Sequence, residues 1–124
     1  MARILVIDDD ALLRGAIRVV LESAGYEVIE AGDGDAGLRL HRELGAELVV
    51  VDLFMPERDG LEVIRAVRAD APQAKIIAMS GGSSLQLDLL DAATAFGASR
   101  TLRKPFAPSM LLAAVRELLG ERGL

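Results

Sequence analysis

The sequence predicts an α/β fold in which a parallel β-sheet is covered by α-helices on both faces. A short apolar run and a helical pattern alternate five times along the chain, at intervals of about 25 residues. The central runs are rich in β-branched residues, as in Val49-Val50-Val51 and Ile76-Ile77, which is typical of strands buried on both faces. This alternation favours right-handed crossovers and a doubly wound sheet. The length suits one domain, placed at residues 1–124.

Five strands are expected, one at each apolar run. The second run differs from the others because Glu27 and Glu30 interrupt it, so it is expected at an edge of the sheet with one side in water. The predicted strands are Arg3–Asp8, Tyr26–Ala31, Glu47–Asp52, Lys75–Ser80 and Arg100–Lys104.

The segments between these runs carry apolar residues at the three- and four-residue spacing of amphipathic helices. Glycines follow four of these segments, where a helix should stop. The clearest apolar stripes are Leu12, Ala16, Ile17, Val20 and Leu21 in the first helix, Leu61, Ile64 and Val67 in the third, and Leu111, Ala114, Val115 and Leu118 in the last. The terminating glycines are Gly25, Gly45, Gly97 and Gly120.

Composition excludes several classes of protein. The chain has no cysteine, which excludes disulfide frameworks, thiolate metal sites and cysteine nucleophiles. A net charge of −5 and the absence of tryptophan argue against direct binding of nucleic acid. The apolar run Ile4–Ile7 is too short for a signal peptide or a membrane span. We therefore expect no membrane insertion and a cytoplasmic location.

Polar residues that can do chemistry follow four of the five predicted strands. The first strand ends in Asp8-Asp9-Asp10, the third in Asp52, the fourth in Ser80 and the fifth in Lys104-Pro105. Parallel strands end at one edge of the sheet, so these groups are expected to gather there. Two carboxylates about 5 Å apart repel by roughly 3 kcal/mol at an effective dielectric of about 20. A divalent cation would relieve that repulsion, and oxygen-only ligands favour Mg²⁺.

Asp52 is the predicted nucleophile of this group. A carboxylate that attacks phosphorus forms an acyl phosphate, and the cation, Lys104 and the Ser80 hydroxyl would share the charge on the transferred oxygens. Lysine suits this role as a compact point charge. Lys104 is one of only two lysines in a chain that otherwise uses arginine, which favours a specific role for it.

Four segments occur together in a specific order and spacing. They are Val6-Ile7-Asp8-Asp9-Asp10, then Asp52-Leu53-Phe54-Met55-Pro56 followed by Asp59-Gly60, then Ser80, and finally Lys104-Pro105-Phe106. With this set the chain resembles, over essentially its whole length, the receiver domain of bacterial two-component response regulators. The resemblance implies a flavodoxin-like five-stranded sheet in the order 2-1-3-4-5 and a cis Lys104–Pro105 bond.

The resemblance also implies a Mg²⁺-dependent phosphoryl switch. Asp52 would accept the phosphoryl group from a histidine kinase or a phosphotransfer protein. Asp9, Asp52 and the main-chain carbonyl of Phe54 would bind Mg²⁺ directly, with Asp8 assisting through water. Such a domain is no enzyme in the ordinary sense, because it catalyses only its own phosphorylation and dephosphorylation.

Ser80, Thr101, Lys104 and Pro105 are the predicted switch residues. Most receivers carry an aromatic residue three positions before the lysine, and Thr101 stands there in this chain. No ring can therefore follow the Ser80 hydroxyl toward a phosphoryl group, and a weaker or differently routed switch is expected.

The expected output surface lies on the fourth helix, the fifth strand and the fifth helix. The fourth helix has more apolar residues than one face needs, which predicts a docking site for a downstream protein. These residues are Leu85, Leu87, Leu89, Leu90, Ala92 and Phe96.

Two other functions are compatible with the sequence. Asp8-x-Asp10 after an apolar strand also begins the pattern of haloacid dehalogenase-like phosphohydrolases, with Ser80 and Lys104 as later motifs. That pattern needs an acidic pair after the lysine strand, whereas the next carboxylate here is Glu117, in a predicted helix. The third possibility is a pseudo-receiver that only binds partners.

Three features have structural interpretations. Asp10 is expected to cap the helix that follows it. Gly32–Gly37 matches the dinucleotide pattern G-x-G-x-x-G, but Asp33 and Asp35 would place negative charge against a pyrophosphate, so a turn and helix cap are expected instead. His41, the only histidine, is expected on a solvated helix face.

Overall fold

The structure, a computed structural model, describes residues 1–55, 59–81 and 84–120, with residues 84–88 described by their backbone alone. Within these residues five parallel strands form one sheet in the order β2-β1-β3-β4-β5, as predicted. The elements in chain order are β1 (Arg3–Ile7), α1 (Ala11–Ser23), β2 (Glu27–Ala31), α2 (Gly34–Leu44), β3 (Leu48–Asp52), α3 (Gly60–Asp70), β4 (Lys75–Ser80), α4 (Ser84–Phe96), β5 (Arg100–Arg103) and α5 (Pro108–Leu118).

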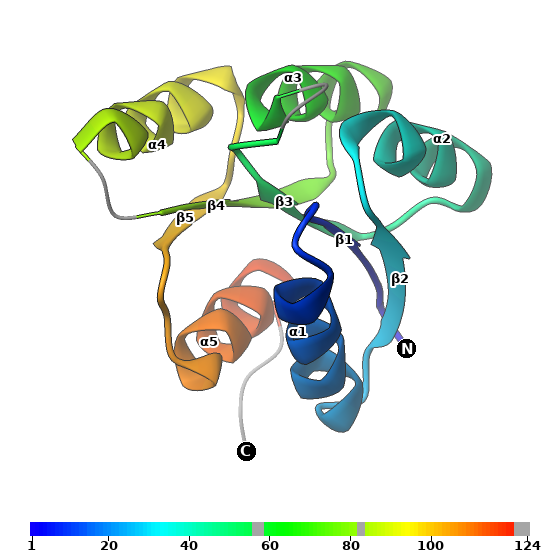
Figure 1. The fold of residues 1–124 in the computed structure, drawn as a ribbon. Coiled ribbons are helices and arrows are strands. Elements are labelled where there is room, and N and C mark those ends of the chain that lie inside the picture. The colour runs from blue at the N-terminus through cyan, green and yellow to red at the C-terminus, as the bar shows by residue number, and fades with distance from the viewer. Residues whose placement is uncertain (56–58, 82–83, 121–124) are drawn as a thin grey trace.

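Helices cover both faces of the sheet, with α2, α3 and α4 on one side and α1 and α5 on the other (Figure 1). Side chains of a strand alternate between faces, so each central strand supplies two apolar cores. Leu5, Ile7, Val49 and Val51 pack toward α2 and α3, and their chain neighbours pack toward α1 and α5. No helix among the described residues combines the length and apolarity that a membrane span requires.

The predicted helix caps are confirmed. Asp10 accepts hydrogen bonds from the main-chain N–H groups of Leu12 and Leu13, which begins α1. Asp33 accepts one from the N–H of Ala36, so the glycine-rich segment is a helix cap, as expected. The four glycines expected to end helices all have positive φ.

The second strand lies at the edge of the sheet, as predicted. Its two carboxylates lie on opposite faces of β2. Residues three apart in a strand point to opposite faces, so Glu27 pairs with Arg3 while Glu30 lies half-buried under α1. There Glu30 forms ion pairs with two arginines of α1.

The prediction for His41 is wrong. His41 is only 8% exposed, because it shares the buried face of α2 with Leu38, and α2 packs against α3. It lines a cavity of about 530 Å³ together with Asp70 and Ala71 at the end of α3. Burial lowers the pKa of His41, so the neutral ring is the favoured form in the folded chain.

Candidate functional site

Three carboxylates meet at the carboxyl ends of β1 and β3. Asp8 and Asp9 follow β1 directly, and Asp52 is the last residue of β3. One oxygen from each of the three lies within 4.8 Å of the others. Asp8 and Asp52 are buried and Asp9 is exposed, so the group forms a pocket that is open on the side of Asp9. The structure thus brings together the acidic residues that the sequence placed at one edge.

Lys104 lies between the two buried carboxylates. Its Nζ is 3.1 Å from Asp8 Oδ2 and 3.3 Å from Asp52 Oδ1. β5 positions this lysine, because the Lys104 N–H donates a 2.6 Å hydrogen bond to the Ser80 carbonyl and so continues the pairing with β4. One ammonium therefore faces three carboxylates, and the pocket carries excess negative charge.

The titration of the pocket reflects this imbalance. The pKa of Asp52 is raised to about 6: burial is the main cause and the nearby Asp8 charge adds to it, while Lys104 and the Phe54 N–H oppose the rise. Burial alone would lower the pKa of Lys104, but Asp52 and Asp8 outweigh burial and hold it above its ordinary value. Lys104 is thus charged at neutral pH. The ionised form of Asp52 is destabilised in the folded chain relative to an ordinary aspartate.

This donor set fits a hard divalent cation. Mg²⁺ prefers oxygen ligands and is commonly held by one or two carboxylates. The three carboxylates offer oxygens close enough together to share one ion, and their excess charge favours a cation.

Hydrogen bonds to neighbouring residues hold both the main chain and the side chain of Asp8. The Asp8 N–H donates to the Ala31 carbonyl of β2, and Asp8 Oδ1 accepts from the Asp10 N–H at 2.9 Å. The Asp8 carbonyl accepts a 2.7 Å hydrogen bond from an Nη of Arg14. The sequence reasoning missed Arg14. A signal was present, because Arg14 lies one helical turn after the Asp10 cap.

Ser80 is completely buried at the end of β4. Its Oγ has no hydrogen-bond partner among the described residues. A buried hydroxyl without a partner costs about 1–3 kcal/mol, so this group is available to a ligand that brings an acceptor.

The other predicted switch residues lie along β5 and just beyond it. Thr101 pairs with Ala78 of β4 and is half-buried. The Lys104–Pro105 bond is cis, as the resemblance implied. Phe54 directs its N–H toward Asp52, while its ring is largely exposed to solvent.

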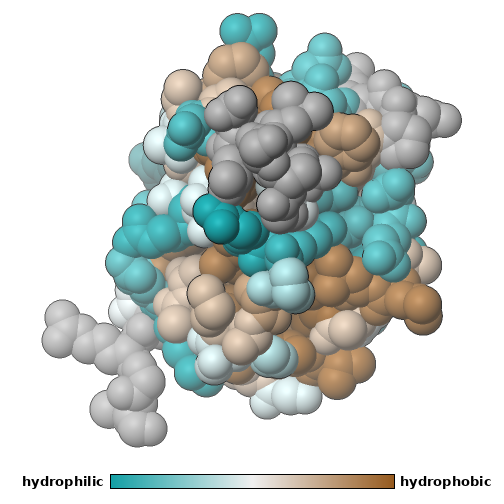
Figure 2. Space-filling model, turned by 60° about the vertical axis from the view of Figure 1, so that its left-hand side comes forward, coloured by the Kyte–Doolittle hydropathy of each residue, from teal (hydrophilic) through white to brown (hydrophobic). Residues whose placement is uncertain are grey.

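The expected output surface is described only in part. The side chains of Leu85 and Leu87, like residues 82 and 83, lie outside the described residues. Leu89 and Leu90 are half-buried against the core, and Arg65 covers the Phe96 ring at 5.0 Å. Figure 2 shows apolar surface on the lower part of the molecule, and Leu12 of α1 and Met110 of α5 are exposed apolar side chains.

Glu117 lies at the wrong end of the sheet for the phosphohydrolase pattern. It forms an ion pair with Arg100, the first residue of β5, whereas Lys104 follows the last residue of that strand. The carboxylate pair that such a hydrolase needs beside its lysine is therefore not supplied by Glu117.

Comparison with known proteins agrees with the geometry of the site. The profile of the response regulator receiver domain matches residues 4–116. The chemotaxis protein CheY of Thermotoga maritima is 34% identical over 119 residues, which cover 94% of this chain and 96% of CheY. A solved response regulator receiver domain protein from Clostridium thermocellum matches with a TM-score of 0.90 at 31% identity, covering 97% of this chain and 95% of that one.

A longer relative shows the same likeness over part of its length. The DNA-binding response regulator MtrA of Mycobacterium tuberculosis is 38% identical over 119 residues, which cover 94% of this chain but 50% of MtrA. The chain thus spans about half the length of this relative. With the sheet order and the acidic pocket already described, these matches establish that the chain belongs to the response regulator receiver domain family.

Proposed function

We propose that this receiver is switched by a phosphoryl group carried on Asp52. The observation that supports this most strongly is the position of Lys104 Nζ, 3.3 Å from Asp52 Oδ1 and 3.1 Å from Asp8 Oδ2, beside the exposed Asp9. Phosphoryl transfer needs an in-line nucleophile and positive charge around the transferred oxygens. Asp52 provides the first, and Lys104 with a divalent cation provides the second.

The donor is a phosphohistidine on a histidine kinase or a phosphotransfer protein. An Oδ of Asp52 attacks phosphorus, the new O–P bond forms as the N–P bond breaks, and the donor imidazole leaves with the electron pair. The raised pKa of Asp52 makes the ionised carboxylate more basic than an ordinary aspartate, yet it is still mostly ionised above pH 7. Lys104 keeps its proton throughout and neutralises charge on a transferred oxygen.

Mg²⁺ is the proposed cofactor, and it would neutralise charge on the phosphoryl oxygens. Asp9, Asp52 and the Phe54 carbonyl would hold it directly, with Asp8 contributing through water. The mutual approach of the three carboxylates and the exposure of Asp9 support this assignment.

Ser80 is the proposed sensor of the phosphoryl group. Its buried Oγ has no partner among the described residues and can donate to an acceptor oxygen at Asp52. Ser80 adjoins β5 through the Lys104 N–H bond to its carbonyl, so a shift of β4 reaches Thr101, Lys104 and Pro105. The change passes to a downstream protein at the α4–β5–α5 face without an aromatic ring. We propose a cytoplasmic protein–protein signal with no direct contact to nucleic acid.

Acetyl phosphate with Mg²⁺ distinguishes this function from the alternatives. A receiver should gain the mass of one phosphoryl group, because the small donor replaces phosphohistidine. A phosphohydrolase would instead turn over phosphate esters repeatedly, and a pseudo-receiver would do neither. Intact-mass spectrometry after treatment with acetyl phosphate, together with a separate phosphate-release assay on a phosphate monoester, reads all three outcomes. An unchanged mass with Mg²⁺ present would contradict the proposal.

Mg²⁺ should stabilise the folded chain, because binding to the folded state adds about 0.4 kcal/mol when the free ion equals its Kd and about 1.4 kcal/mol at ten times Kd. Asp9→Asn should lose most of this gain, since Asp9 is the exposed ligand of the pocket. Circular dichroism melting curves measure the effect, as the chain has no tryptophan. Asp91→Asn is the matched control, with the same charge change at an exposed site on α4. Equal Mg²⁺ shifts in the two variants would exclude Asp9 from the site.

A further inference from the structure

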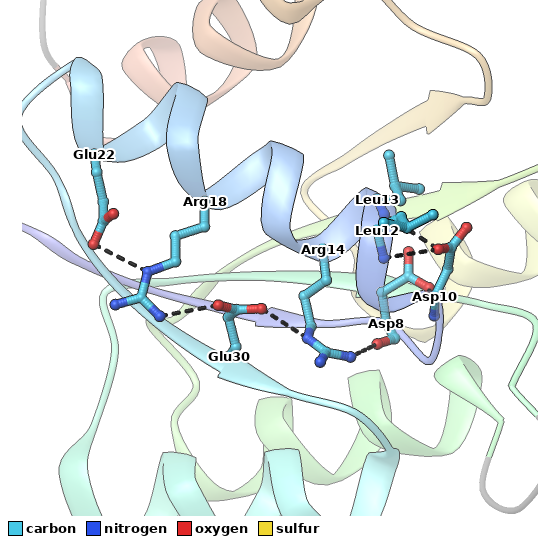
Figure 3. Close-up of polar contacts among 8 residues, drawn as sticks. All are labelled: Asp8, Asp10, Leu12, Leu13, Arg14, Arg18, Glu22 and Glu30. Carbon is cyan, nitrogen blue, oxygen red and sulfur yellow. Dashed lines mark hydrogen bonds and ion pairs between the residues drawn. The ribbon is translucent and has the colours of Figure 1, made fainter.

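A chain of charged side chains connects the acidic pocket to the edge strand β2. Arg14 of α1 donates through Nε to Glu30 Oε1 at 2.8 Å and through Nη to the Asp8 carbonyl at 2.7 Å (Figure 3). The other carboxylate oxygen of Glu30 accepts from Arg18 at 2.9 Å, and Arg18 Nε reaches Glu22 at 3.1 Å. The two arginines therefore share one glutamate, but only Arg14 reaches the pocket.

Arg14 contacts Asp8, a central residue of the acidic pocket. Asp8 has no exposed surface, and its carboxylate meets both the Asp10 N–H and Lys104 Nζ. The direction of that side chain follows from the main chain at Asp8, which is held by the Ala31 carbonyl on one side and by Arg14 on the other. Both holding groups depend on β2, since Ala31 belongs to it and Glu30 fixes Arg14.

We propose that Arg14, held by Glu30, is a positioning residue for the divalent-cation pocket. It fixes the Asp8–Asp9 segment at the separation from Asp52 that a shared ion requires. This inference rests on the proposed Mg²⁺ site. Groups that orient metal ligands through a second layer of hydrogen bonds commonly change metal affinity by about 10–100-fold when they are removed.

A purely electrostatic role and a positioning role for Arg14 predict opposite changes in Mg²⁺ affinity when Arg14 is replaced, so the two can be distinguished. Removing a cation beside an acidic pocket would tighten binding of Mg²⁺ if charge alone mattered. Removing the hydrogen bond that positions Asp8 would instead weaken binding of Mg²⁺. Glu30 keeps Arg18 as its partner when Arg14 is replaced, so the change leaves no unpaired buried carboxylate.

Arg14→Met is the test variant, because methionine keeps much of the apolar stem and removes both hydrogen bonds. Arg18→Met is the matched control, since it removes the other partner of Glu30 and does not touch Asp8. Isothermal titration should give a Mg²⁺ Kd weaker by about tenfold or more for Arg14→Met, and within about twofold of the wild type for Arg18→Met. A Kd for Arg14→Met equal to or tighter than that of the wild type overturns the proposal.

Amide hydrogen exchange in EDTA gives a readout that needs no metal. The N–H groups of Asp8 and Asp10 should exchange faster in Arg14→Met, with Val50 of β3 as the reference for global opening. If these N–H groups exchange in Arg14→Met at the wild-type rate, Arg14 does not position Asp8 and the proposal is overturned. If the wild-type chain shows no saturable Mg²⁺ binding, the proposed cation site fails, and exchange alone then decides whether Arg14 positions Asp8.

Arg14→Lys keeps the test decisive if Arg14→Met does not fold. Lysine retains the charge but cannot donate to Asp8 and Glu30 with the fixed fork of a guanidinium. A Mg²⁺ Kd for Arg14→Lys that is weaker than the values for the wild type and Arg18→Met, but less than tenfold weaker, supports a positioning role for Arg14. A wild-type Kd in Arg14→Lys, together with wild-type amide exchange, assigns Arg14 to charge alone and overturns the proposal.

Discussion

Asp52→Asn is expected to abolish transfer of a phosphoryl group from acetyl phosphate to the chain. The amide has no anionic oxygen to attack phosphorus, and neither neighbour can replace it easily. Asp8 is buried and held by the Asp10 N–H and Lys104, while Asp9 lies at the pocket entrance. Intact-mass spectrometry should show no gain for Asp52→Asn and an unchanged gain for Asp91→Asn. A gain of wild-type size in Asp52→Asn would place the acceptor elsewhere.

The same substitution should stabilise the metal-free chain at neutral pH. The folded-state pKa of Asp52 is about 6, above its ordinary value of 3.8. A raised folded-state pKa means that this carboxyl contributes its full stability only below its ordinary pKa of 3.8, where it is protonated in both states. That contribution is lost as the pH rises through 6. The full difference corresponds to about 3 kcal/mol, an upper bound for the gain from an uncharged amide at pH 7.5.

The pH dependence separates this effect from a change in packing. Urea unfolding in EDTA should give a higher free energy of unfolding for Asp52→Asn than for the wild type at pH 7.5, and nearly equal values at about pH 3, below the ordinary pKa of the carboxyl. Asn is close to Asp in volume, so packing contributes little at either pH. A gain of the same size at both pH values would show that the ionised carboxylate is not its source.

Gly60→Ala is expected to be the most destabilising single-methyl change near the site. A Cβ at this position would lie 2.4 Å from the main-chain oxygen of Asp52 and 2.6 Å from the Cα of Leu53. These are backbone atoms at the end of β3, so relief requires α3 to move away from the strand that carries Asp52. The Gly60 N–H bond to the Leu53 carbonyl at 3.1 Å would be lost with it. We expect a loss of about 3 kcal/mol or more in the free energy of unfolding.

Gly15→Ala is the matched control for that change. Gly15 lies inside α1, and a Cβ there meets nothing within 4 Å. Alanine should therefore stabilise the chain by about 0.5–1 kcal/mol, as in any open helix position. Urea unfolding of the two variants should give opposite signs. Equal effects would mean that the contact between Gly60 and the end of β3 does not constrain the site.

The parts of this structure that follow from local pattern could be predicted from the sequence. Apolar runs and helical stripes gave the parallel sheet, and parallel strands force Asp8, Asp52 and Lys104 to one edge. The cap at Asp10 likewise depends only on the residues beside it. These features need no knowledge of how distant side chains meet.

The parts that depend on packing between elements could not be predicted in this way. His41 looked solvated because its chain neighbours are charged, but the contact of α2 with α3 buries it. Glu30 looked like an edge carboxylate, but α1 lies over it and supplies Arg14 and Arg18. The same contact makes Arg14 part of the site. Charge patterns along the chain do not show which arginine will meet which glutamate across two elements.

Phosphorylation of Asp52 can be tested directly by locating the phosphoryl group after treatment with acetyl phosphate. Borohydride reduces an aspartyl phosphate to homoserine, so peptide mass spectrometry can identify the residue that carried it. We expect homoserine at position 52 when Mg²⁺ is present, and no homoserine there in EDTA. Homoserine at position 8 or 9, or labelling at position 52 that is equal with and without Mg²⁺, would contradict this expectation.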